Sequence, residues 1–484
     1  MIFTSIEFLV FFVAAATGYA LVPPAARWIW LLATSIFFYA YAGPTFLLQI
    51  VAAATVSYGI AFGIERAATK PGKQTLLTTG IVLLLANLCV FKYAPFFNSV
   101  LGPMVGWSGA DHPLIPLLMP LGISFYTFQL IGYLIDIYRG DKAERHFGLF
   151  SLYVMFFPKV ISGPIERSKN LLPQLHALPN FSYPLAIAGM QLMLWGAFKK
   201  VVVADRIAPF VDRVYSAPQD FDGVATMFAT WLYAFQLYFD FSGYTDMALG
   251  ASMVLGIKLM QNFDRPYFAV SVQDFWKRWH ISLTSWLTDY VYTPITRSKW
   301  IRIKLYNLIL IALMSTFLIS GFWHGSQWNY VAWGGLHGAY IVISLLVQKP
   351  WNKFAKNVGL TRFPRSYTAF KIARTFSLVC FAYILFRAAN MGDALYMMGN
   401  LWTGWDDIAG SLRSVLQGDT RAMALSLLGI VIVMAPECFQ HRKLGDVVTQ
   451  PLWRTWGLHY ALALSIVLLG AFDGMGQQFI YFRF

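Results

Sequence analysis

Apolar runs about twenty residues long recur from one end of this 484-residue sequence to the other. A helix of that length spans the roughly 30 Å hydrocarbon core of a bilayer. Hydrophobic residues make up 57% of the chain and charged residues only 12%, against roughly 25% in soluble domains. The pattern predicts an all-α polytopic membrane protein with about eleven to thirteen membrane helices. The clearest runs are Ile6–Val22, Thr45–Ile64, Leu76–Phe91, Leu305–Gly321 and Ala461–Phe472 with its flanks.

The net charge of +14 comes largely from basic residues in short loops between these runs. Residues 349–374 hold seven Lys or Arg and no acid, which marks a cytoplasmic loop by the positive-inside rule. Counting runs outward from this loop places both termini, including the tail 473–484, on the extracytoplasmic side. Because orientation in the membrane explains the charge, the lipid bilayer is the expected partner and nucleic acid is not.

The middle of the chain is irregular. Phe147–Ile161 is short for a membrane span and runs directly into Ser162-Gly-Pro-Ile-Glu-Arg167. Non-helical backbone at membrane depth is tolerated only inside protein or beside a water-filled cavity. We therefore expect a re-entrant element that lines a cavity. No internal repeat is visible, so residues 1–484 are treated as a single domain.

Two of the eight histidines, His280 and His324, lie in aromatic stretches of this apolar chain. An imidazole at membrane depth costs several kcal/mol unless it has a partner, so a histidine kept there usually has a function. The ordinary pKa of histidine, near 6.5, suits proton transfer close to neutral pH. The sequence therefore predicts an intramembrane general base.

The stretch Ser271–Tyr290 is predicted as one amphipathic helix that opens with a Ser271/Asp274 capping box. At helical spacing His280 shares a face with polar residues, opposite a wall of aromatic ones. This pattern is typical of an interfacial helix with one side on a hydrophilic tunnel. The alternative, equally supported by the pattern, is a helix on the membrane surface with His280 in solvent. The polar face comprises Gln273, Lys277, His280, Thr284 and Thr288.

His324 follows a long apolar run and lies between Trp323 and Gly325, with Gly321 just before. The glycines allow backbone or ligand to approach closely, and the indole can exclude water. The alternative is a structural histidine held by a backbone carbonyl. His337, further along the chain, is expected to be a packed helix residue.

Motifs of other chemistries are missing from the sequence. It contains no GxSxG elbow, HExxH pair, P-loop or GxGxxG fingerprint. The three cysteines, at positions 89, 380 and 438, are too far apart in sequence to indicate a zinc site or a disulfide framework. No metal site and no bound cofactor are predicted.

Six segments, taken in order, resemble motifs of the membrane-bound O-acyltransferase family, above all its bacterial alginate O-acetyltransferase subgroup. The resemblance covers residues 1–390 and returns in the C-terminal aromatic tail 479–484. It implies tilted helices, with interfacial and re-entrant elements, around a central funnel. The segments are Gly122–Gln129, Tyr133–Gly140, Gln236–Asp246, Asn262–Tyr267, Phe275–His280 and Gly321–Gly325.

The resemblance also implies roles for individual residues. His324 matches the catalytic histidine of the family and His280 its second active-site histidine. Tyr481 resembles a terminal tyrosine proposed to carry the acyl group in the related D-alanine system. The indoles of Trp323 and Trp279 and the amide of Gly325 are candidate oxyanion donors. The candidate substrate-binding residues are Trp323, Trp279, Lys277, Asp136 and Gln129.

The predicted function is that of a membrane O-acetyltransferase in a bacterial cytoplasmic membrane. It takes acetyl from a cytoplasmic donor, acetyl-CoA by expectation, for O-acetylation of an extracytoplasmic polysaccharide such as alginate. The resemblance implies a separate extracytoplasmic acetyltransferase of the serine-hydrolase type as partner. Two alternatives stay open: a transporter or flippase with a histidine proton relay, and acylation of peptidoglycan, teichoic acid or lipid.

Overall fold

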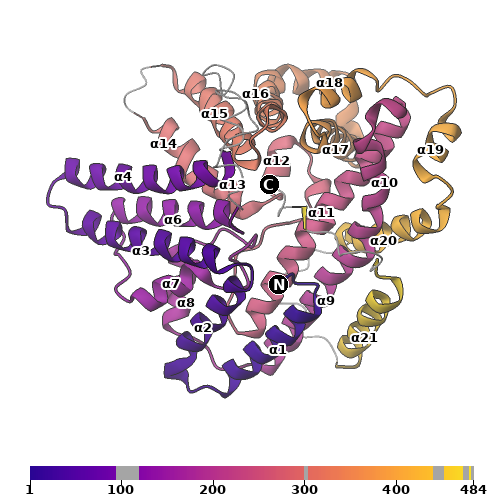
Figure 1. Cartoon of the computed structure of the whole chain (residues 1–484). Helices are drawn as coiled ribbons and strands as arrows, with labels where there is room; N and C mark the ends of the chain where they lie inside the picture. Colours follow the sequence, from indigo (N-terminus) through magenta and orange to yellow (C-terminus); the bar gives the residue numbers. More distant parts are fainter. Residues whose placement is uncertain (94–118, 299–302, 440–451, 472–478, 481–484) are drawn as a thin grey trace, which may run out of the picture.

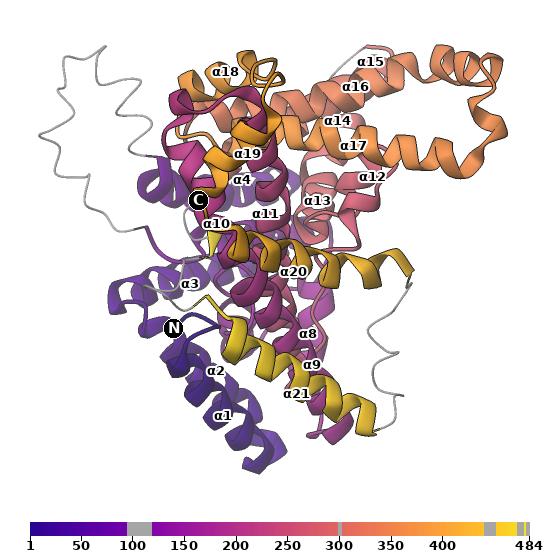
Figure 2. The same ribbon diagram turned by 90° about the vertical axis from the view of Figure 1, so that its right-hand side faces the viewer.

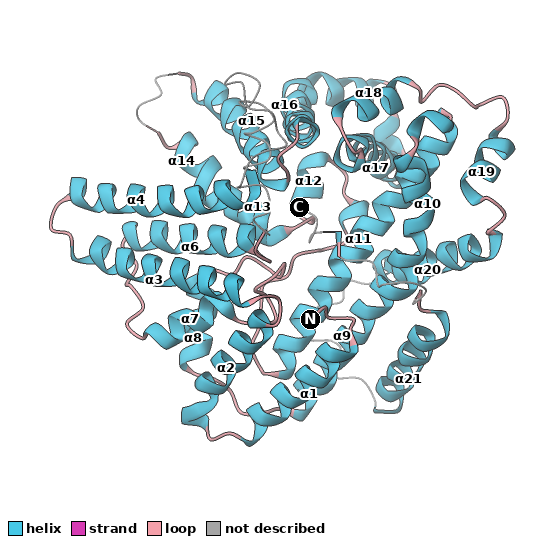
Figure 3. Cartoon of the chain, viewed as in Figure 1, coloured by secondary structure: helices cyan, strands magenta, loops and turns pink. Residues whose placement is uncertain are grey.

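A computed structural model describes residues 1–93, 119–298, 303–439, 452–471, 479 and 480. These residues form helices joined by loops, with no β-strand among them (Figures 1 and 3), so the all-α class is confirmed. The helices that are long and apolar enough to cross a membrane are fewer than the predicted spans, because other helices are shorter or more polar. Within the described residues, the seven helices that qualify are Pro44–Arg66, Lys70–Tyr93, Tyr183–Ser216, Leu305–His324, Trp328–Asn357, Pro364–Arg387 and Thr420–Cys438.

The N-terminal part forms a layer in which α3, α4 and α6 lie side by side (Figure 1). Helix α6 is buried almost along its whole length and carries two of the predicted site residues, Gln129 and Asp136. The bounds in this part are α1 Ile6–Leu21, η1 Pro24–Ala26, α2 Arg27–Ala40, α3 Pro44–Arg66, α4 Lys70–Leu88, the π-helix η2 Cys89–Tyr93 and α6 Ile123–Tyr138.

The predicted break in the middle of the chain is confirmed. Helix α7, Phe147–Met155, is followed by a non-helical segment and then by α8, Ser168–His176. Residues 152–166 are all buried, so protein surrounds this irregular backbone, as its position in a membrane protein requires.

Helix α11, Gly223–Val254, is 32 residues long and mostly buried. It packs closely against α9, Tyr183–Ala197, because glycines face each other where the helices touch. A Cβ atom on Gly250 would lie 2.5 Å from the carbonyl oxygen of Gly189. Along the chain, α9 and α11 are connected by the π-helix η4 (Phe198–Ala204), α10 (Asp205–Ser216) and η5 (Pro218–Asp220).

The C-terminal half contains the helix pair α15–α16 and a long pair, α16 and α17, that extends away from the other helices (Figure 2). The remaining bounds are η6 Pro266–Phe268, α12 Val272–Trp276, α13 Ile281–Leu287, the π-helix η7 Thr288–Tyr292, α14 Thr293–Thr296, α15 Leu305–His324, α16 Trp328–Asn357, η8 Leu360–Arg362, α17 Pro364–Arg387, α18 Met391–Gly399, α19 Ile408–Leu416, α20 Thr420–Phe439 and α21 Leu452–Leu469.

Candidate active site

The prediction of one continuous helix over Ser271–Tyr290 is wrong. Its start is confirmed: the Ser271 hydroxyl accepts the Asp274 N–H (3.1 Å), and the Asp274 carboxylate accepts the Val270 N–H (3.0 Å). The helix α12 ends at Trp276, however, and α13 begins only after His280. His280 itself has φ 45° and ψ 53°, a left-handed conformation that is uncommon for a residue other than glycine.

The break is held by Asn262, which precedes it by 18 residues and supplies partners that a helix would have supplied. Its backbone carbonyl accepts the Ile281 N–H (2.9 Å), and its side-chain Oδ1 accepts the Ser282 N–H (3.2 Å). These long-range hydrogen bonds compete with the local i to i−4 pattern. A residue in a sparsely populated conformation persists only where its surroundings enforce it.

The break turns His280 into the protein. Its exposed fraction is 0%, whereas Gln273, Lys277 and Thr288 are exposed. The prediction that His280 shares a polar face with them is therefore wrong, and so is the alternative of a solvated His280. The ring lies instead against Phe241 (4.8 Å between centroids) and Phe125 (6.3 Å).

The hydrogen bonds at Asn262 also define the protonation of His280. Oδ1 must be the oxygen of the amide, because the Ser282 N–H donates to it and the Ser282 hydroxyl lies 2.6 Å away. The Nδ1 atom of His280, at 3.4 Å from this oxygen, is then the protonated nitrogen, and Nε2 is the basic one. Burial lowers the pKa of His280 to about 3, so the ring is neutral at neutral pH.

His324 is the last residue of α15 and is 2% exposed. The ring of Trp323 lies next to both histidines, with centroids 4.8 Å from His324 and 6.2 Å from His280. Trp333 (5.0 Å) and Phe386 (5.3 Å) enclose the imidazole of His324 on other sides. Two histidines from separate elements thus meet at one indole within an aromatic enclosure.

Trp323 and Trp333, the two tryptophans beside His324, both have an indole N–H without an acceptor among the described residues. Trp323 is 4% exposed, so its N–H is buried, yet none of the described residues accepts it. A buried donor without an acceptor costs roughly 1–3 kcal/mol. Trp286, which is 5% exposed, instead donates its indole N–H to the Phe128 carbonyl at 2.8 Å. The N–H of Trp323, unlike that of Trp286, is therefore not engaged by an acceptor among the described residues.

The end of α15 is capped by two side chains that sequence reasoning missed. The Lys92 ammonium donates to the Trp323 carbonyl (2.5 Å), and the Tyr93 hydroxyl donates to the Phe322 carbonyl (2.8 Å). Carbonyls at the end of a helix need such donors, and a cation there also complements the helix dipole. A signal did exist, since Lys92 is a lone charge at the end of an apolar run.

The glycines beside His324 do allow close approach, but to the protein's own α16. A Cβ atom on Gly321 would overlap the Tyr330 carbonyl oxygen, and one on Gly325 would overlap the Tyr330 ring. The Gly325 N–H, a predicted oxyanion donor, lies 3.4 Å from the Gly321 carbonyl within the last helical turn. These glycines therefore fix the α15–α16 contact and thereby the position of His324.

The other predicted site residues fall in different surroundings. Trp279 packs against Phe263, Phe275 and Tyr238. The Gln129 amide accepts from Lys159 (2.5 Å) and donates to the Tyr153 carbonyl (2.8 Å). The Asp136 carboxylate accepts the Tyr290 hydroxyl (2.8 Å).

The described residues therefore bring together His280, His324 and Trp323, and they do not place Trp279, Lys277, Asp136 or Gln129 in this group. Tyr481 lies outside the described residues. His337 is packed as expected: its Nδ1 accepts the Trp276 indole N–H at 3.2 Å.

Comparison with known proteins assigns this arrangement to a family. A sequence model of the membrane-bound O-acyltransferase family matches residues 146–387, which include both histidines. The chain is 34% identical over 443 residues to the probable alginate O-acetylase AlgI of Azotobacter vinelandii, covering 90% of this chain and 84% of that protein. It is also 34% identical to the peptidoglycan O-acetyltransferase of Helicobacter pylori, with 82% and 77% covered. A teichoic acid D-alanyltransferase of Streptococcus thermophilus is 32% identical, with 56% and 68% covered. The chain belongs to the membrane-bound O-acyltransferase family.

Proposed function

We propose that this protein transfers acetyl from cytoplasmic acetyl-CoA, through a bacterial cytoplasmic membrane, for O-acetylation of an extracytoplasmic polysaccharide. The observation that carries the proposal is the meeting of His280 and His324 at the Trp323 indole inside a multi-pass membrane protein. The relatives named alginate O-acetylase support acetyl as the group and a polysaccharide as the acceptor.

In the proposed reaction His324 acts as the general base. Its imidazole takes the proton of an attacking hydroxyl while the hydroxyl oxygen bonds to the thioester carbonyl carbon. The Trp323 N–H donates to the oxyanion of the tetrahedral intermediate. The intermediate collapses with cleavage of the C–S bond, and the proton passes from the imidazolium to the leaving thiolate. A positioned base typically contributes about 10²–10⁴-fold to the rate.

His280 supports this step from the other side of the indole. Its neutral ring, with Nε2 as the basic nitrogen, can relay a proton or orient the attacking group without adding a buried positive charge. The aromatic walls formed by Phe241, Phe125 and Phe386 keep water away from the thioester.

The proposal includes Tyr481 as the first acyl acceptor. A phenol hydroxyl is a weak nucleophile until a base removes its proton, which His324 would do. The acetyl-tyrosine ester then passes its acetyl to a serine-hydrolase-like partner on the extracytoplasmic side, and from there to a sugar hydroxyl. The N- and C-termini are extracytoplasmic in this proposal.

Proteoliposomes loaded with [¹⁴C]acetyl-CoA test the function directly. With the partner and alginate outside, label is expected on the polymer, and an uncoupler of proton gradients should leave the transfer rate unchanged. Transport of unmodified polymer that stops with the uncoupler would favour the transporter alternative and refute the proposal. Peptidoglycan and teichoic acid serve as competing acceptors, because relatives that share 34% and 32% identity are named for them.

A further inference from the structure

A second polar cluster lies inside the helix bundle, on α11 and the π-helix η4. Lys200 of η4 is 2% exposed and pairs with two carboxylates, Asp240 of α11 (2.5 Å) and Asp205 (2.8 Å). Its neighbour Lys199 pairs with Asp246 of α11 at 2.6 Å. The wider turn of a π-helix lets two consecutive lysines face the same partner helix, and such turns are frequent at functional sites.

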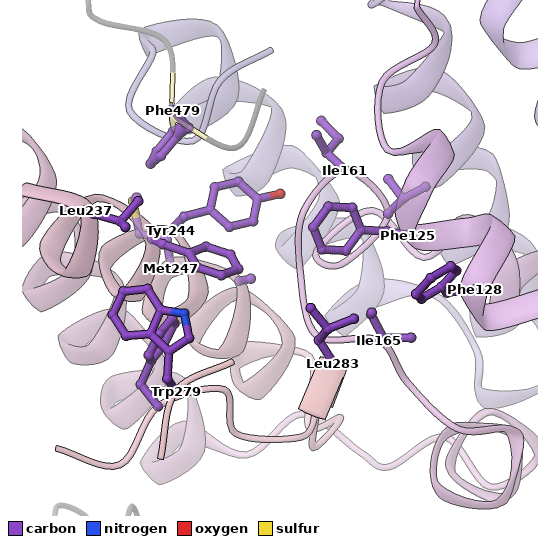
Figure 4. Packing of buried hydrophobic residues seen from close by; sticks show 14 of the residues in the cluster. Phe125, Phe128, Ile161, Ile165, Leu237, Tyr244, Met247, Trp279, Leu283 and Phe479 are labelled. Atoms are coloured by element: carbon purple, nitrogen blue, oxygen red, sulfur yellow. The ribbon is translucent and has the colours of Figure 1, made fainter. Parts of the chain in front are cut away.

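Phe479 and Ile480, near the C-terminus, contact this cluster. The backbone N–H of Ile480 donates to Asp240 Oδ2 at 2.8 Å, while the other carboxylate oxygen, Oδ1, faces Lys200. The ring of Phe479, whose residue is 1% exposed, lies 4.6 Å from the Lys200 ammonium and 4.9 Å from the ring of Tyr244. Figure 4 shows Phe479 and Tyr244 on one side of the buried cluster. Two residues of the tail thus make a charged hydrogen bond, a cation–π contact and an aromatic contact.

The hydrogen bond between Asp240 and Ile480 lies next to the residues that surround His280. Asp240, which binds Ile480, is directly followed in α11 by Phe241, whose ring lies 4.8 Å from the ring of His280. Tyr481 follows Ile480 directly in the sequence. Residues 479 and 480 are therefore held on the helix that also forms one wall of the His280 site.

We propose that Asp240, Lys200 and the Tyr244 ring form a docking site for residues 479–480, and that this docking positions the adjoining Tyr481 for acyl transfer at the histidine pair. Asp240 and Lys200 are positioning residues in this proposal. It rests on the proposed function for its purpose, whereas the docking itself does not depend on any activity.

Charge explains why Asp240 is the residue to change. In Asp240→Ala the buried Lys200 keeps Asp205, so the substitution removes the tail contact without leaving a cation unpaired. Asp246→Ala is the matched control: it removes a carboxylate of the same helix from the neighbouring lysine, and Lys199 keeps the Ser242 hydroxyl at 2.9 Å. Asp246 pairs with Lys199, whereas residues 479–480 contact Asp240, Lys200 and Tyr244.

Docking can be measured by cysteine labelling. Ile480→Cys keeps the backbone N–H, and the three native cysteines are replaced by alanine in the full-length protein. A hydrogen bond to a charged group is worth about 1.5–3 kcal/mol, so Asp240→Ala should speed maleimide labelling of position 480 by about tenfold or more. Phe479→Ala should do the same, and Asp246→Ala should leave the labelling rate unchanged. Equal rates in all four proteins would overturn the docking site.

The positioning role is read from kinetics with native Ile480. Asp240→Ala should lower kcat for acetyl delivery to the polymer and leave the KM for acetyl-CoA unchanged, because donor binding does not involve the tail. Asp240→Asn, which retains an oxygen for the Ile480 N–H, should restore part of kcat. Faster labelling with an unchanged kcat would overturn the positioning role. If the parent protein transfers no acetyl, the proposed function and the positioning role both fail, while the labelling pattern still reports the docking.

Discussion

The substitution Trp323→Phe tests whether the indole N–H contributes to catalysis, because it removes this donor and keeps an aromatic ring next to the two histidines. Phenylalanine keeps an aromatic ring beside His324 and His280, which lie 4.8 and 6.2 Å from the indole, but removes the N–H donor together with part of the buried ring. Loss of one oxyanion donor costs about 10²–10³-fold in kcat. Because no described residue accepts this N–H, Tm should fall only by the cost of the smaller buried ring, with no added cost from a lost hydrogen bond.

Trp286→Phe is the matched control, since Trp286 is equally buried and its N–H donates to the Phe128 carbonyl at 2.8 Å. Trp286→Phe loses the same part of a buried ring and also leaves a buried carbonyl without its donor, at a further cost of about 1–3 kcal/mol. Its Tm should therefore fall further than that of Trp323→Phe, while kcat is maintained. Both variants are assayed for acetyl transfer from acetyl-CoA and for thermal unfolding in detergent. A Trp323→Phe enzyme with wild-type kcat would refute the role of the indole as oxyanion donor.

Three further predictions concern the structure around the histidines. Asn262→Ala leaves the Ser282 N–H and the His280 Nδ1–H without their acceptor. This should destabilise the protein by about 2–4 kcal/mol and reduce acetyl transfer. An unchanged Tm would contradict the role given to Asn262. The folded-state pKa of His280, about 3, lies below the ordinary 6.5, so the unfolded chain binds the extra proton and stability should fall as pH drops below 6.5. In His280→Asn, which tolerates the left-handed backbone, a Tm measured from pH 7 to 4 should lose this part of the acid sensitivity, and an identical profile would count against it. Gly321→Ala places a methyl group against the Tyr330 carbonyl and should lower Tm and activity. In the control Gly335→Ala the new methyl group would lie 3.4 Å from a Leu318 methyl and should be tolerated. Equal Tm values of the two variants would show that close packing at Gly321 does not stabilise the protein.

The sequence was sufficient to predict the fold class and to select the two histidines. Long apolar runs leave few alternatives to membrane helices, and an imidazole in such surroundings stands out by its cost. The helix start at Ser271 was also predictable, because the Ser271 hydroxyl and the Asp274 N–H are only three residues apart; the second bond of the predicted capping box differs, since Asp274 accepts from Val270 in place of Ser271.

The backbone at His280 was not predictable, because its cause lies 18 residues earlier, in the carbonyl and amide oxygens of Asn262. Helical periodicity assigns faces only while the helix continues, so one left-handed residue removed His280 from its predicted face. The same holds for Lys92, whose carbonyl partner on Trp323 is 231 residues away, and for Asp240, which binds Ile480 across 240 residues. Such contacts follow from the tertiary fold and have no local signal.

The role of His324 as the base for acyl transfer is tested by comparing two alanine variants. His324→Ala and His337→Ala are matched: both histidines are buried, and both rings lie 5.0 Å from Trp333. Acetyl transfer from [¹⁴C]acetyl-CoA is measured with equal amounts of each folded protein in liposomes. We predict that His324→Ala loses about 10²-fold or more of the rate, while His337→Ala retains most of it. Wild-type transfer by His324→Ala would contradict the account.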